Sequence, residues 1–403
     1  MVFHLSDFPP QLAWLMSEFR LIVNKSIRIA LSQDIRSRYR LTAAAYGQLS
    51  AQHNIHKQYI PSAFEVAMGA LKAYRKRLRK GGRSSTPYMM RLMLKAENQS
   101  YRLDRETGRL RIPVRRGEMA AILHLPMSDW HHSVLDDPSW RLGSLTVVPG
   151  KVIVAVRKDA PECYEPEAAI ALDTNEDSLD GVFAEEDAAG LITLPLGGVR
   201  QVQATHFRRR RRLARKKAND RRVQKRMLDR EGSRERNRVR QRLHAVSKSL
   251  VKAAKEHRAA IVLEDLTLHG AGGRSRGMNR RLSSWPRREI HRQIEYKAAL
   301  EGVPVIKVNP RYTSKTCPAC GVRRRERVGR VFECECGWSM DRQHNAALNI
   351  LNTALASHEV LARGVRFHPG ALRDDMVIPL YDLQSEGARE ESSGDELRCL
   401  EGG

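Results

Sequence analysis

The sequence has few cysteines and no long apolar segment. Six cysteines occur among 403 residues, whereas a secreted domain held together by disulfides is shorter and richer in cysteine. No run approaches the roughly 18 apolar residues of a membrane-spanning helix. The opening stretch, MVFHLSDFPPQLAWLM, lacks the basic start and the apolar core of a signal peptide. We therefore expect a cytoplasmic protein with no membrane partner.

Acidic residues are too few to balance the basic ones. Lys and Arg total 71 against 46 Asp and Glu, which gives a net charge of +25. A field of this sign attracts polyanions, so nucleic acid is the first partner to consider. A basic protein of the ribosomal kind and a protein of anionic membrane surfaces are the alternatives that composition leaves open. The length allows two or three domains with a real core.

Residues 1–160 combine helical and strand patterns. Apolar residues at spacings of three and four predict a helix over 10–32, and a second over 62–80 ends in basic residues before a glycine. The stretches 101–114 and 145–156 alternate around glycine-containing turns, which predicts two hairpins. We interpret this region as a β-module with a helical insertion.

From residue 166 onward, the order of elements is typical of a mixed α/β or α+β sheet flanked by helices. Beyond 362 the chain looks like a tail, because residues 373–403 contain nine acids and three arginines with Gly and Ser. Such a composition predicts disorder. The expected strands are 168–173, GVFAEE, GLITLPL, 259–265 and 303–308, and the expected helices lie within 201–258, near 285–301 and from 342.

The most basic part of the chain is the segment 208–242. It contains 18 Lys or Arg and 4 acids, and this excess of 14 is more than half of the net charge. Such a run cannot be the buried face of a helix; it is either simply solvated or bound to phosphates, with release of salt ions. We predict a basic helical hairpin over 201–258, with Gly232 and Ser233 at the bend. The candidate nucleic-acid contacts are Arg208, Arg209, Arg210, Arg211, Arg212, Arg215, Lys216, Lys217, Arg221 and Arg222, with Arg311 and Lys315 farther along the chain.

Four of the cysteines form two closely spaced pairs. TCPACG holds a C-x-x-C pair, and FECECG holds a C-x-C pair that is one residue shorter than the usual knuckle. Four thiolates in two pairs suit a tetrahedral structural Zn²⁺, although the short second loop could strain or abolish the site. The alternative is a ribbon that packs on Phe332 and Trp338 without metal. The candidate ligands are Cys317, Cys320, Cys334 and Cys336.

Three acids are candidates for a second metal site. Asp173 and Glu264 end predicted strands, and Asp341 precedes the last predicted helix. Carboxylates at adjacent strand ends can converge on Mg²⁺, and two such ions would clamp the attacking and leaving oxygens of a phosphodiester. A single acid in such a place is often a helix N-cap, so the metal site is predicted only from the three acids together, beside a basic hairpin.

The motifs ALDTN, LED, NPRYTSKTCPACG, FECECG and DRQHNAALNI occur in this order. Over roughly 166–357 the chain resembles the C-terminal half of TnpB proteins, the RNA-guided nucleases of insertion sequences, and is equally similar to compact type V CRISPR effectors. The resemblance implies a RuvC-like RNase H fold over 166–316 and 338–361, interrupted by a zinc ribbon over 317–337. It also implies a wedge-like β-barrel with a helical recognition insert over 1–160, a guide RNA, and a target DNA with a short flanking motif.

The resemblance assigns roles residue by residue. Asp173 and Glu264 fall on the first two catalytic acids of the family. The third catalytic Asp lies two residues before the Asn of N-A-A, here Asn345, so its position holds Gln343, an uncharged and weaker ligand. Asp341 matches the less critical first acid of the D-R-D stretch. Because residues two apart on a helix point about 200° from each other, Asp341 takes over only if the helix start shifts.

Three functions remain open at this point. The first is an RNA-guided DNA-binding protein with little or no cleavage, which the amide of Gln343 favours. The second is an active, Mg²⁺-dependent RNA-guided DNA endonuclease that uses Asp173, Glu264 and Asp341. The third is an unguided transposase or junction nuclease, because a shared fold does not decide the function.

Overall fold

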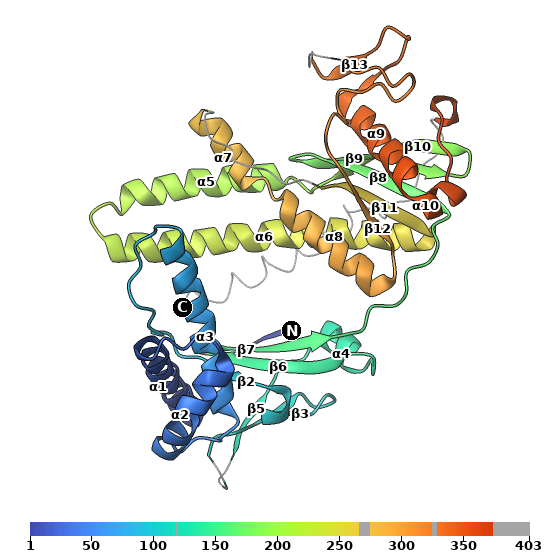
Figure 1. Ribbon diagram of the computed structural model, residues 1–403. Helices are drawn as coiled ribbons and strands as arrows, with labels where there is room; N and C mark the ends of the chain where they lie inside the picture. Colours follow the sequence, from blue (N-terminus) through green and yellow to red (C-terminus); the bar gives the residue numbers. More distant parts are fainter. Residues whose placement is uncertain (116, 118–119, 266–274, 325–328, 374–403) are drawn as a thin grey trace, which may run out of the picture. The chain divides into compact units, whose positions relative to one another are not determined.

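The computed structural model describes residues 1–115, 117, 120–265, 275–324 and 329–373. The chain divides into two units, Met1–Asp159 and Ala160–Gly403 (Figure 1). Within the described residues, no helix combines the length and the apolar character needed to span a membrane.

The first unit combines a helical layer with two antiparallel sheets. One sheet has the strand order β1-β7-β6-β2 and the other β3-β4-β5. The predicted helices over 10–32 and 62–80 are α1 and α3, and the two predicted hairpins are β3–β4 and β6–β7. In chain order the elements are β1 (Val2–His4), α1 (Pro10–Ser32), α2 (Arg38–Gln52), α3 (Tyr59–Arg79), β2 (Leu94–Ala96), η1 (Asn98–Ser100), β3 (Arg102–Leu103), β4 (Arg109–Pro113), β5 (Ala120–His124), α4 (Asp129–Leu135), β6 (Arg141–Val148) and β7 (Lys151–Arg157).

Helix α2 was not expected from the sequence. Its buried residues are Leu41, Ala45 and Leu49, at a spacing of four, and the residues between them are mostly alanine or polar. This stripe is narrow, so its apolar periodicity is weak. The side chain of Ser37 accepts a hydrogen bond from the Arg40 N–H and begins the helix.

The second unit is built on a mixed five-stranded sheet with the order β10-β9-β8-β11-β12. Strands β8, β11 and β12 are parallel, while β9 and β10 run antiparallel to their neighbours. Helices α6 and α8 pack on one face and α9 on the other (Figure 1). The elements are β8 (Ala168–Thr174), β9 (Ser178–Glu185), β10 (Ala188–Pro195), α5 (Val199–Lys216), α6 (Arg221–Glu256), β11 (Ala259–Glu264), α7 (Arg276–Ser284), α8 (Arg287–Glu301), β12 (Val305–Val308), β13 (Val331–Glu333), β14 (Ser339–Asp341), α9 (Arg342–Ser357), α10 (Glu359–Gly364) and η2 (Pro369–Ala371).

The basic segment forms a hairpin of helices α5 and α6, which lie side by side (Figure 1). The predicted bend at Gly232 and Ser233 is wrong, because both residues lie inside α6. The chain turns instead between Lys217 and Asp220, where the Asp220 side chain accepts a hydrogen bond from the Val223 N–H and caps α6. A single glycine inside a long helix costs only about 1 kcal/mol, which the rest of α6 tolerates.

The predicted tail begins too early in the chain. Helix α10 extends to Gly364, and isolated β-bridges join Glu186 to Val365 and Ala189 to Leu372. Val365 is 1% exposed because it packs in the apolar cluster around α9. The stretch up to residue 373 therefore belongs to the folded unit, while 374–403 lie outside the described residues.

Candidate functional site

Asp173 and Glu264 end neighbouring parallel strands. Strands β8 and β11 pair through Leu172 and Leu263, so the next residue of each strand lies at the same edge of the sheet. Both acids face α9, because the residues two positions earlier on each strand belong to the apolar cluster around that helix. Strand pairing thus brings together two acids that lie far apart in the chain.

Burial changes the acidity of both carboxyls. Burial, and after it the charge of the neighbouring Glu264 carboxylate, raise the pKa of Asp173 to about 7. Burial also raises the pKa of Glu264, which is 6% exposed, although a hydrogen bond from Thr313 Oγ1 to Glu264 Oε1 (2.7 Å) opposes this shift. Perturbed carboxyls of this kind are concentrated at functional sites.

A third buried acid, Asp180, lies next to Asp173. The two residues are direct partners in the antiparallel β8–β9 register, and Asp180 is 4% exposed. Its carboxylate accepts hydrogen bonds from Ser178 Oγ (2.6 Å), Thr193 Oγ1 (2.9 Å) and Asn175 Nδ2 (2.7 Å). Asp180 was not among the acids predicted from the sequence. The hairpin spacing in LDTNEDSLD, which sets the two acids opposite each other, is the signal that could have found it. We call Asp180, Asp173 and Glu264 the carboxylate row.

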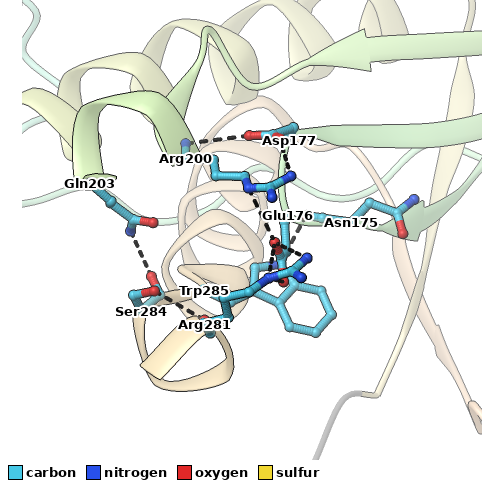
Figure 2. A network of polar contacts seen from close by, with 8 residues as sticks. All are labelled: Asn175, Glu176, Asp177, Arg200, Gln203, Arg281, Ser284 and Trp285. Atoms are coloured by element: carbon cyan, nitrogen blue, oxygen red, sulfur yellow. Dashed lines mark hydrogen bonds and ion pairs between the residues drawn. The ribbon is translucent and has the colours of Figure 1, made fainter. Parts of the chain in front are cut away.

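The β8–β9 turn forms polar contacts with residues of α5 and α7 (Figure 2). The side-chain amide of Asn175 donates to Asp180, and the backbone carbonyl of Asn175 accepts a hydrogen bond from Trp285 Nε1 (2.9 Å). Arg281 of α7 forms two-pronged contacts with Glu176, at 2.9 to 3.2 Å. Arg200 of α5 contacts the same turn.

Asp341 has a different role from the other two predicted acids. Its Oδ1 accepts the Gln343 N–H (2.9 Å) at the start of α9, and its Oδ2 accepts Arg330 Nε (2.9 Å). Burial would raise the pKa of Asp341, but these hydrogen bonds outweigh it and the pKa is lowered. Among the described residues, only the four cysteines form a group of three or more His, Cys, Asp or Glu with ligand atoms within 4.8 Å of one another. By this criterion neither Asp341 nor Asp180 joins Asp173 and Glu264 at ligand distance.

The asparagines of N-A-A-x-N-I anchor α9 rather than line the carboxylate row. Asn345 Nδ2 donates to the Thr316 carbonyl (3.0 Å), and Asn345 Oδ1 accepts Trp338 Nε1 (3.2 Å). Asn349 Nδ2 donates to the carbonyls of Thr313 (2.8 Å) and Thr316 (2.7 Å). These contacts hold the segment that leads to the cysteines against α9, and they position Thr313 beside Glu264.

The four cysteines converge as predicted for a metal site. Their sulfur atoms lie within 4.8 Å of one another, and the Cys317–Cys336 and Cys320–Cys334 Sγ distances are both 3.6 Å. A tetrahedron with Zn–S bonds near 2.3 Å has edges of about 3.8 Å, so the short C-x-C pair does not prevent the geometry. Burial raises the pKa of Cys317 to about 12, whereas the Cys336 N–H lowers the pKa of Cys334 to about 7. The cluster is compatible with a zinc ribbon.

The predicted basic contacts are mostly exposed. Arg210 is the exception in the hairpin, because it is half-buried and paired with Glu235 of α6. His206 and Glu231 form a buried pair between the same two helices (2.8 Å). Arg311 is exposed and its guanidinium lies over the Tyr312 ring, and Lys315 is half-buried. The exposed members are Arg208, Arg209, Arg211, Arg212, Arg215, Lys216, Lys217, Arg221 and Arg222.

Two family models match parts of this chain. Residues 288–350 match the "Cas12f1-like, TNB domain" model, which covers α8, β12, the cysteine cluster and the start of α9. Residues 15–113 match the model of the "Uncharacterized protein MJ0013 family".

Curated relatives cover more of the chain. TnpB-like protein MJ0751 of Methanocaldococcus jannaschii is 26% identical over 237 residues, which are 57% of this chain and 84% of the relative. TnpB-like protein MJ0012 of the same organism is 32% identical over 146 residues, covering 36% of this chain and 67% of the relative. The CRISPR-associated endodeoxyribonuclease Cas12f1 of Sulfoacidibacillus thermotolerans is 37% identical over 112 residues, which are 27% of this chain and 25% of that protein.

A solved structure shares the fold. The chain in a cryo-EM structure of a Cas12f1–sgRNA–target DNA complex aligns with a TM-score of 0.60 and 13% identity, over 83% of this chain and 81% of that one. At this identity the likeness concerns the fold, which is the mixed α+β architecture described above. Taken together with the sequence relatives, the matches show that this chain belongs to the family of TnpB-like proteins and compact type V CRISPR effectors.

Proposed function

We propose that this protein binds a guide RNA and targets complementary DNA beside a short flanking motif, and that its RuvC-like site holds Mg²⁺. The observation that carries the proposal is the pairing of Asp173 and Glu264, at the positions of the family's first two catalytic acids, at one edge of the sheet. The structural neighbour supports it, because that Cas12f1 is in a complex with an sgRNA and target DNA.

The hairpin of α5 and α6 supports nucleic-acid binding. Nine of its predicted contacts are exposed. The buried residues of α5 are Val199 and His206, which precede the basic run. Arginines in such an array neutralise phosphates without reading sequence. In an RNA-guided system this suffices, because base pairing reads the sequence and the protein reads duplex shape and the flanking motif.

The residues of the carboxylate row suit a hard divalent cation. Carboxylate oxygens are the ligands that Mg²⁺ prefers, and no described Lys or Arg forms an ion pair with Asp173 or Glu264. When bound, Mg²⁺ supplies charge stabilisation to the oxygens of a phosphodiester. Thr313 orients Glu264 for this role, and Asp341 caps α9.

The remaining parts complete the proposal. The cysteine cluster holds a structural Zn²⁺ within a ribbon over 317–337, inserted in a RuvC-like domain over 166–316 and 338–361. Residues 1–160 act as the wedge-like module with a helical recognition insert. The antiparallel sheets and the helices α1 to α3 of that unit support this assignment.

The decisive experiment isolates the protein from its host, sequences the RNA that copurifies and tests a plasmid matched to that RNA. We expect a discrete, structured RNA and strong protection or cutting of the matched plasmid over a scrambled one. DNA binding without RNA, and without preference for any complementary strand, would replace the proposal with an unguided transposase or junction nuclease.

A further inference from the structure

We propose that Arg287, at the start of helix α8, binds a backbone phosphate of the DNA strand that reaches the carboxylate row. The inference rests on the proposed function and adds a binding residue that the family resemblance did not assign. The ligand is a single phosphodiester group, bound by a guanidinium together with the N-terminal end of a helix.

The side chain of Arg287 is buried without a partner. The residue is 9% exposed, and its Nε and Nη1 atoms are buried and form no hydrogen bond. No acid among the described residues forms an ion pair with it. Burial, and after it the charge of Arg288, lower the pKa of Arg287. A guanidinium stays charged nevertheless, and a buried charge without a counter-charge is costly. An anion at this guanidinium would offset that cost.

Glu289 lies in the first turn of α8 but does not neutralise Arg287. Its Oε1 atom accepts hydrogen bonds from Arg292 Nη2 (2.7 Å) and Gln293 Nε2 (3.0 Å), three and four residues farther along the helix. The carboxylate is therefore directed away from the helix start. Arg292 has its counter-charge within the protein, whereas Arg287 does not.

The guanidinium of Arg287 points back past the start of α8. Its Cζ atom lies 5.0 Å from the ring centroid of Trp285, two residues earlier in the chain. Pro286, between them, is the N-cap of this 15-residue helix and accepts no hydrogen bond through its side chain. The first N–H groups of a helix carry partial positive charge and lack partners within the helix, which favours anions at this end. The guanidinium and the helix start therefore attract an anion to the same place.

The start of α8 lies at the same edge of the sheet as the acids. His291 Nε2, one turn into α8, lies 2.8 Å from Oγ1 of Thr174, the last residue of β8. Trp285 Nε1 donates to the carbonyl of Asn175, the next residue (Figure 2). In α/β sheets, ligands bind outside the carboxyl ends of the strands, close to helix N-termini. A DNA strand that crosses this edge toward the carboxylate row can therefore contact Arg287.

The test is a double-mutant cycle between Arg287 and single phosphates of DNA. It uses the full-length protein with its bound RNA, and a DNA strand that pairs with this RNA and extends unpaired at both ends. One phosphate at a time in the extensions is replaced by an uncharged methylphosphonate, and binding is measured by fluorescence anisotropy at several salt concentrations. For the wild type, replacement at one or two adjacent positions should weaken binding about tenfold.

Arg287→Met should reproduce this loss on unmodified DNA. It should also lower the slope of log affinity against log salt by about 0.7, the value for one phosphate contact to a single strand, and it should no longer respond to the methylphosphonate at those positions. Arg292→Met is the matched control, since it removes an exposed and paired arginine from the same helix. The control should keep the wild-type slope and the wild-type pattern of sensitive phosphates.

The outcomes separate this inference from the proposed function. If Arg287→Met binds like the wild type, or responds to the same methylphosphonates, the inference is overturned and the proposed function stands. A wild type that binds matched DNA but responds to no methylphosphonate has the same meaning. Absence of copurified RNA, or of any preference for matched DNA, overturns the proposed function instead.

A purely structural role for Arg287 predicts a different result. If the guanidinium only packs on Trp285, Arg287→Met should lower the free energy of unfolding in urea and leave DNA binding unchanged. Because the buried charge is unpaired, we expect equal or higher stability of this variant without DNA. Arg287→Gln replaces Arg287→Met in the cycle if the latter does not fold. If neither variant folds, the guanidinium is required by the fold itself, and the inference is overturned.

Discussion

The cysteine cluster and the carboxylate row bring ligands together in different ways. The cysteines come from one short segment, 317–336, and their sulfur atoms already lie within 4.8 Å of one another. The acids come from β8, β9 and β11, and they meet only because these strands pair. In the described part of the ribbon, 317–324 and 329–337, Phe332 is the buried apolar side chain besides Cys317, whereas the sheet has an apolar cluster on each face.

This difference has a physical consequence. A short ribbon without a core depends on its metal for folding, while a sheet with two packed faces folds first and then holds acids close together at an electrostatic cost. Zn²⁺ should therefore be required for folding at the cysteine cluster, whereas a cation at the carboxylate row should only reduce the repulsion between acids. Four changes to the chain would sharpen or break this contrast.

The largest effect should come from Cys317→Ser. Cys317 is 1% exposed and contributes to the cluster that we expect to hold Zn²⁺. Structural zinc contributes about 10–16 kcal/mol to small metal-dependent folds, so the variant should lose one Zn²⁺ per chain and become protease-sensitive over the ribbon. Metal analysis by mass spectrometry and limited proteolysis check this. Cys163→Ser, at an exposed cysteine far along the chain, is the control. Zinc-free wild-type protein with an intact ribbon would show that packing on Phe332 and Trp338 is enough.

Asp173→Asn should change the pH dependence of stability in Mg²⁺-free buffer. The folded-state pKa of Asp173 is about 7, above the value near 3.9 of an unfolded chain. Its protonated form is therefore favoured by folding, and this contribution is full below about pH 4 and is lost as the pH rises to 7. The difference in free energy of unfolding, variant minus wild type, should therefore be up to about 4 kcal/mol larger at pH 8 than at pH 4.

Urea unfolding at both pH values measures this gain. The difference between variant and wild type is the useful quantity, because other groups also titrate. Burial lowers the pKa of His291 to about 4, so its contribution is lost as the pH falls and has the opposite slope. Identical pH profiles for the two proteins would mean that Asp173 is not under electrostatic strain.

Asn349→Ala should lower the stability of the protein without changing its zinc content. The amide of Asn349 donates to the carbonyls of Thr313 and Thr316, and the residue is 7% exposed. The Thr313 carbonyl loses its Asn349 donor and the Thr316 carbonyl keeps only Asn345, which should cost about 1–3 kcal/mol, measured as a lower melting temperature. The zinc content should stay at one per chain, since the ligands are local. Loss of zinc from this variant would mean that the ribbon depends on α9 after all.

The smallest effect should come from Gly232→Ala in the basic hairpin. A Cβ at this position meets only the flexible end of Arg236, at 3.4 Å. The substitution should therefore stabilise the protein by about 0.5–1 kcal/mol, measured by urea unfolding. Gly198→Ala is the matched control and should destabilise the protein, because Gly198 has a φ of +69° at the start of α5. A loss of stability in Gly232→Ala would contradict a regular helix at this position and support a bend there.

Much of this molecule follows from local sequence. Helix α1 spans Pro10–Ser32 as its apolar spacing predicts, and the hairpins and the parallel strands also lie where their patterns place them. Helix α2 was not predicted, because its buried stripe is narrow and consists of Leu41, Ala45 and Leu49 alone. The bend of the basic hairpin was misplaced because glycine is a weak signal inside a strong helical run, and the cap at Asp220 decided the turn.

The sequence by itself determined the strands, the long helices, the excess of basic charge and the two cysteine pairs, because each depends on residues within a few turns or strands of one another. Only the tertiary structure decided which acids meet. Asp180 faces Asp173 through hairpin register, Glu264 joins them through parallel pairing, and Asp341 is held by Arg330 and the start of α9. Such choices depend on contacts between distant segments, and a carboxylate looks the same in the sequence whether it caps a helix or faces a cation.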